Sequence, residues 1–93
     1  PDPRLLKLRQ YFEQYDCPLS RMSETFLEVA DAHGLDWRLL PSISMVESSG
    51  GKYFKNNNVF GWDNCRYRFS SIEQSIHQVG RSLARSETYR GRD

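Results

Sequence analysis

One carboxylate, Glu47, stands where a helical pattern places an apolar face. In a helix predicted over residues 37 to 47 or 48, successive side chains turn by about 100°, so Glu47 projects between the directions of Leu40 and Ile43. Removal from water disfavours the charged form of a carboxyl, and a protonated carboxyl is what protonation of a glycosidic oxygen requires. The pattern predicts a general acid. Alternatively, the helix frays at Glu47 and the side chain simply reaches solvent near the glycine pair that follows.

The segment after this helix has the composition of a sugar-binding loop. Residues 52–67 lose helical periodicity and are rich in Asn and aromatic residues, with one glycine, Gly61, between two of the aromatic residues. The amides of Asn57 and Asn58 suit sugar hydroxyl and acetamido groups, and Trp62 offers a broad face for stacking. The alternative is a turn-forming Asn run whose aromatic side chains pack back into the core, and for Phe60 we favour the core.

Four helices would position these groups. Apolar residues at helical spacing, bounded by capping and terminating residues, predict helices over four stretches: from Pro3 until just before Cys17-Pro18, from about Arg21 to His33, over residues 37 to 47 or 48, and from Ser70 or Ser71 onward. No stretch repeats internally. We therefore expect one all-α domain over residues 1–93.

The overall composition narrows the possible functions. The 93 residues are 38% hydrophobic and 27% charged, with 13 basic and 12 acidic residues and a formal charge of +1. No apolar run is long enough to span a membrane. A near-neutral charge also argues against a nucleic-acid binder, which must neutralise many phosphates. Arginines do gather in the C-terminal third, where they would favour an anionic cell-wall polymer or form an ordinary solvated surface.

The two cysteines, Cys17 and Cys65, lie far apart in the sequence and lack metal-binding spacing. A single disulfide closing a long loop is the leading interpretation, and it would stabilise a small domain by about 2–4 kcal/mol. Such a bond implies an oxidising compartment. The alternative is two independent buried thiols.

Two stretches together resemble the glucosaminidase and lytic-transglycosylase branch of the lysozyme superfamily. Residues 35–52 end a predicted helix with Glu47-Ser48, and the loop reads Asn57-Asn58-Val59-Phe60-Gly61-Trp62. Those proteins place a catalytic Glu in a helix-ending Glu-Ser motif and follow it with an Asn-x-Phe-Gly loop. The resemblance implies a small lysozyme-like fold in which Glu47 is the general acid.

The same resemblance implies further site residues. Asn58, Phe60 and Gly61 match the loop that lines the family's cleft, and Tyr89 matches a tyrosine that can lie near the acid and steer the reacting sugar. Many glycosidases also need a second carboxylate, whereas transglycosylases and substrate-assisted enzymes manage with one. Asp63 and Glu73 are the positional candidates, although turn and capping chemistry explains both.

We therefore expect an exported enzyme that cleaves β-1,4 bonds of peptidoglycan or a related N-acetylated glycan. It would be a hydrolase or a lytic transglycosylase of the periplasm, cell envelope or extracellular space, monomeric, without metal or cofactor, and part of a longer protein. A non-catalytic glycan-binding or structural module with the same fold is the alternative. A small helical protein- or DNA-binding domain would leave Glu47 without a purpose.

Overall fold

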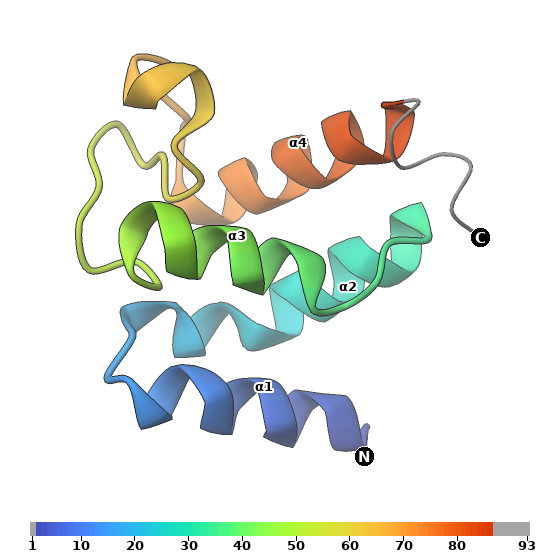
Figure 1. The fold of residues 1–93 in the computed structure, drawn as a ribbon. Helices are drawn as coiled ribbons and strands as arrows, with labels where there is room; N and C mark the ends of the chain where they lie inside the picture. Colours follow the sequence, from blue (N-terminus) through green and yellow to red (C-terminus); the bar gives the residue numbers. More distant parts are fainter. Residues whose placement is uncertain (1, 87–93) are drawn as a thin grey trace.

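Four α-helices form the framework of residues 2–86, the part of the chain that the computed structural model describes (Figure 1). They are α1 (Pro3–Gln14), α2 (Ser23–His33), α3 (Leu39–Ser48) and α4 (Ile72–Arg85), and two short 3-10 helices join them, η1 (Pro18–Met22) and η2 (Trp62–Cys65). No strand occurs within these residues. The prediction of a compact all-α domain is confirmed.

Side chains at the predicted starts of α1 and α4 bind the free backbone N–H groups there. The carboxylate of Asp2 accepts a hydrogen bond from the N–H of Arg4 at 2.9 Å. At α4, Ser71 accepts from the N–H of Gln74 at 2.9 Å, and Gln74 accepts from the N–H of Ser70 at 3.4 Å. The capping residue is therefore Ser71, and the side chain of Gln74 binds the residue just before it.

The second helix starts later than predicted. The tight 3-10 helix η1 (Pro18–Met22) precedes it, and α2 begins at Ser23, not near Arg21. Ser23 is not a cap, because its hydroxyl donates to the carbonyl of Ser20 at 2.7 Å. At the other end, Gly34 ends α2 in the left-handed conformation, with φ +67°.

The third helix also starts later, at Leu39 and not at Trp37. Asp36 accepts from the N–H of Arg38 at 2.9 Å, so it closes a turn that leads into the helix. The Asp36 carboxylate also binds the guanidinium of Arg38. These bonds hold the pKa of Asp36 down at about 2.

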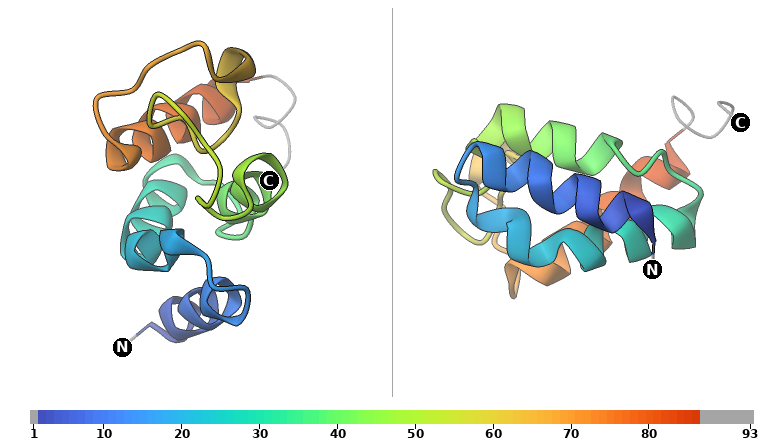
Figure 2. Two further views of the ribbon diagram at one scale, coloured as in Figure 1. Left: turned by 90° about the vertical axis from the view of Figure 1, so that its left-hand side faces the viewer. Right: turned by 90° about the horizontal axis from the view of Figure 1, so that it is seen from below.

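The helix α2 contacts each of the other three helices (Figure 2). An aromatic column crosses this core: the rings of Phe12 and Phe26 lie 5.6 Å apart, and those of Phe26 and Phe60 lie 6.3 Å apart. The absence of a side chain at Gly80 lets α4 approach Val29 of α2, because a Cβ there would overlap the valine. The segment between α3 and α4 lies at one end of the helices (Figure 1). No helix within residues 2–86 is both long and apolar enough to cross a membrane.

The predicted disulfide between Cys17 and Cys65 is not formed; both cysteines are free. Cys17 is buried against Gly50, and its thiol contacts the carbonyl of Tyr15. Cys65 is half-buried, and its thiol points to the carbonyl of Asn58 within its own loop. Each sulfur is held by a different part of the fold, so the alternative of two separate thiols describes this structure.

We expect two free thiols and unequal rates of reaction in the native protein. The thiolate is the reactive form, and burial raises the pKa of the Cys17 thiol, whereas Cys65 is more accessible. A chromogenic disulfide reagent should count two thiols in the denatured, unreduced protein and label Cys65 first in the native protein. In Cys65→Ser the fast phase should disappear. A count of zero thiols would instead show that the crosslink forms.

Candidate active site

Glu47 lies in the last turn of α3, and its side chain is exposed. The prediction that it takes a core position is therefore wrong. The buried side of α3 includes Ser44 and Ser48 as well as Leu40, whereas Ile43 is only half-buried. The buried face of α3 is therefore centred near Ser44 and Ser48, not between Leu40 and Ile43 as predicted. Glu47 lies at the edge of this face.

The carboxyl of Glu47 lies directly against the backbone of Gly61. A Cβ built on Gly61 would come within 2.7 Å of the Glu47 Oε1 atom and 3.1 Å of its Cδ atom. Gly61 also has φ +67°, a conformation that other residues adopt only with strain. Glycine at position 61 thus permits both the close approach to Glu47 and the left-handed backbone. The loop that follows α3 thereby covers one side of the Glu47 carboxyl.

The side chain of Asn58 holds this loop together. It is 1% exposed, and its Nδ2 donates to the carbonyls of Trp62 at 2.7 Å and Tyr67 at 3.0 Å. Its Oδ1 accepts from the N–H of Trp62 at 2.9 Å. The amide that the sequence analysis assigned to sugar recognition is fully used by the protein backbone, so Asn58 positions Gly61 and Trp62.

The preceding asparagines also build the loop. Asn56 and Asn57 have φ +59° and +56°, in the left-handed region that asparagine tolerates better than most residues. Asn56 donates to the carbonyl of Cys65 at 2.8 Å, and Asn57 donates to that of Phe69 at 2.9 Å. The sequence allowed the asparagines either to bind sugar or to form turns. Their left-handed backbone and their hydrogen bonds to backbone carbonyls fit the turn-forming interpretation.

Exposed aromatic and apolar side chains flank the end of α3. Trp62, 38% exposed, directly follows Gly61, and Tyr53, 75% exposed, is tied to the helix end by a 3.1 Å hydrogen bond from its N–H to the carbonyl of Ser48. Val46, next to Glu47, is also exposed. The ring of Phe60 belongs to the core at 4% exposure, so it anchors the loop and does not face the surface.

The two candidates for a second carboxylate have partners elsewhere. Asp63 lies 3.5 Å from the guanidinium of Arg66 on the exposed side of η2. Glu73 accepts from the hydroxyl of Thr25 at 3.3 Å, which joins α4 to α2. The predicted site residue Tyr89 lies outside the described residues.

No cluster of three or more metal-ligating side chains occurs within residues 2–86. Comparisons of the chain with protein-family models, with curated proteins and with solved structures find no match. The candidate site is therefore defined by its own geometry: a carboxyl on the last turn of α3, covered on one side by the backbone of Gly61 and followed by the exposed ring of Trp62.

Replacement of the buried amide should loosen the loop. Asn58→Ala removes three hydrogen bonds and leaves backbone groups of Trp62 and Tyr67 without a partner. We expect the free energy of unfolding to fall by about 2–3 kcal/mol, measured by urea denaturation. Gln10→Ala, which truncates an exposed amide on α1, is the control and should change it by under about 0.5 kcal/mol. Equal effects would contradict this role for Asn58.

Proposed function

We propose that this protein is a glycosidase with a lysozyme-like fold that cleaves β-1,4 bonds of peptidoglycan, with Glu47 as the general acid. We further propose that it is exported and acts in the periplasm, the cell envelope or the extracellular space. The observation that carries the proposal is the contact between the Glu47 carboxyl and Gly61, with Trp62 next in the chain. A carboxyl covered on one side and open on the other, with an exposed tryptophan directly after the covering glycine, suits a polymeric sugar substrate.

In this mechanism Glu47 transfers its proton to the glycosidic oxygen as the bond to the anomeric carbon breaks. The leaving sugar departs as an alcohol, and positive charge develops on the sugar that remains. The carboxyl is exposed in the free protein. A bound glycan would cover it, and exclusion of water favours its neutral, proton-donating form. Trp62 would stack on a sugar face and hold the chain in place.

A single acid suffices for this chemistry. Asp63 and Glu73 make contacts of their own, with Arg66 and Thr25, so we assign neither a catalytic role. The developing charge would be quenched by a group of the substrate or by water. Attack by a hydroxyl of the same sugar gives an anhydro-sugar end, and attack by water gives a reducing end. In either route the attacking hydroxyl or water loses one proton as the new C–O bond forms, and transfer of that proton to the Glu47 carboxylate restores the acid.

Digestion of purified peptidoglycan by the wild type and by Glu47→Gln tests the assignment. Gln has the same shape but no acidic proton, so turnover should fall by at least about 100-fold with the fold unchanged. Mass spectrometry of the fragments then identifies reducing or anhydro ends. Glu28→Gln, at an exposed site on α2, should behave as the wild type.

Two results of this digestion would overturn the proposal. An unchanged rate for Glu47→Gln would show that another group donates the proton. Absence of fragments from the wild type, with retention of the protein on the glycan, would favour a non-catalytic binding module.

The contact at Gly61 provides a second test. Gly61→Ala places a methyl group against the Glu47 carboxyl in a left-handed backbone conformation, and it should reduce both turnover and stability. Gly34→Ala is a matched control, because Gly34 has the same φ of +67° but nothing lies within 4 Å of its would-be Cβ. Both variants should lose about 1–2 kcal/mol of unfolding free energy, measured by urea denaturation. Turnover should fall only for Gly61→Ala, and equal turnover in the two variants would exclude a role for this contact in catalysis.

A further inference from the structure

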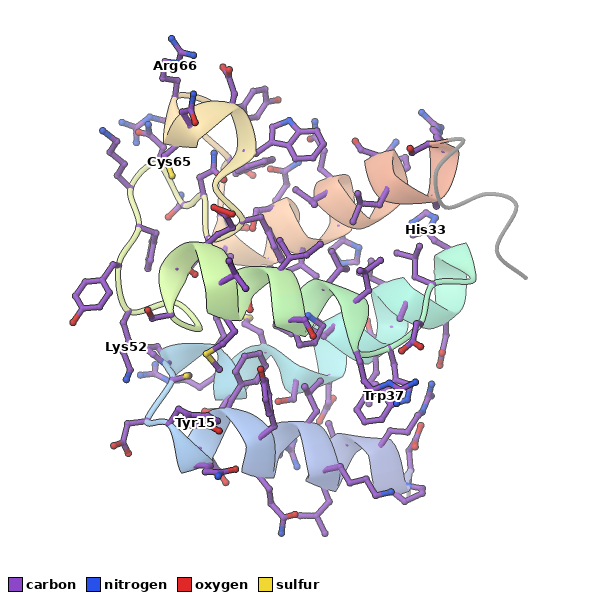
Figure 3. All side chains as sticks on the ribbon, in the orientation of Figure 1. Tyr15, His33, Trp37, Lys52, Cys65 and Arg66 are labelled. Atoms are coloured by element: carbon purple, nitrogen blue, oxygen red, sulfur yellow. The ribbon has the colours of Figure 1, made fainter. Side chains whose placement is uncertain are left out.

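A cavity opens between α1 and the start of α3, at the other end of α3 from Glu47. It has a volume of about 230 Å³, and its walls are mostly apolar, with Leu8, Tyr11, Trp37 and Pro41 forming them beside Lys7 and Arg38. Figure 3 shows Trp37 far from Cys65, which lies in the loop that follows α3. The cavity is therefore separate from the candidate active site.

Two cations border this cavity, but only one of them is available. The guanidinium of Arg38 donates to both carboxylate oxygens of Asp36, at 3.0 and 2.9 Å, and its carbon lies 5.8 Å from the centre of the Trp37 ring. Lys7 takes part in none of the five ion pairs within residues 2–86. Lys7, one of the residues that line this mostly apolar cavity, thus carries an ammonium group outside any of these ion pairs.

The size and walls of the cavity limit what it can hold. A dry apolar cavity of about 150 Å³ accepts benzene, so a volume of about 230 Å³ suits one ring with a short side chain. The rings of Tyr11 and Trp37 favour a flat aromatic group over a branched aliphatic one. Lys7 and Tyr11 are four residues apart on α1 and therefore share one helix face, so an anion on the ligand would meet the ammonium while its ring meets the tyrosine.

From these features we propose that the cavity between α1 and α3 binds small aromatic carboxylates, with the ring among Leu8, Tyr11, Trp37 and Pro41 and the carboxylate on Lys7. This inference does not depend on the proposed glycosidase activity, because it uses none of the residues around Glu47. A ligand of this class would contact both helices and so stabilise their packing.

Titration with 3-phenylpropionate tests the proposal, with its neutral counterpart 3-phenylpropanol as the control ligand. In Trp62→Phe protein, Trp37 is the single tryptophan, so its fluorescence reports on this cavity alone. We expect saturable binding of the carboxylate, and binding of the alcohol that is about three- to five-fold weaker, as is typical of an exposed charge pair. Amide shifts in NMR spectra should centre on Lys7, Tyr11 and Trp37.

Removal of the charge separates the role of Lys7 from simple apolar binding. Lys7→Gln should weaken binding of 3-phenylpropionate by the same three- to five-fold and leave 3-phenylpropanol unaffected. Lys55→Gln, which neutralises an exposed lysine in the loop after α3, should leave both affinities unchanged. The proposal is overturned by a lack of saturable binding, by equal affinity for the two ligands, by an unaltered affinity in Lys7→Gln, or by amide shifts confined to other parts of the molecule.

Discussion

The position of the candidate site depends on the packing of Phe60 against Phe26. Phe26 already contacts Phe12, so this column links α1, α2 and the loop that follows α3. Burial of one such ring contributes about 1.5–3 kcal/mol, which offsets the entropy lost by ordering about two residues. A loop of this length needs more anchors, and the buried side chains of Val59 and Phe69 supply them. Because Gly61 directly follows Phe60, the same burial that fixes the ring also fixes the backbone beside the Glu47 carboxyl.

Most of the helical framework could be predicted from the sequence because its signals are local. Apolar spacing of three and four residues, Ser71 before α4 and Gly34 after α2 each act within one or two turns of the chain. The starts of α2 and α3 were less predictable. Pro18 starts the 3-10 helix that precedes α2, and Asp36 closes the turn that precedes α3. The spacing of apolar residues alone does not distinguish such a turn from a first helical turn.

The chemistry of the loop was harder to predict, since it depends on which groups meet between residues four to nine positions apart in the chain. An asparagine amide can bind a sugar or a backbone carbonyl equally well, and the sequence does not say which is nearer. Here Asn58 meets Trp62 and Tyr67. The loop gains its order from amide side chains in place of β-ladder hydrogen bonds, which explains how an Asn-rich segment without strands holds Gly61 in position. The contacts of the two cysteines were unpredictable for the same reason. Their separation in the sequence did not show that each thiol would contact a nearby backbone carbonyl and not the other cysteine.

The placement of Glu47 follows from the small residues on the buried side of α3. Ser44 donates to the carbonyl of Pro41 at 2.8 Å, and Ser48 donates to that of Ser44 at 2.9 Å, so these hydroxyls are satisfied within the helix. Such a face can be buried without polar partners from other helices. Ser48 also accepts from the N–H of Gly51 at 3.1 Å, which ties the helix end to the turn that follows.

The carboxyl of Glu47, next to Ser48 in the chain, therefore has one side against the protein and one side open to solvent. Gly61 covers one side of the Glu47 carboxyl and the side chain stays exposed, so the protein does not itself remove the carboxyl from solvent. In the proposed reaction, the bound glycan would exclude water from it. If Glu47 is the general acid that we propose, this arrangement would favour the proton-donating form when a substrate is present to receive the proton.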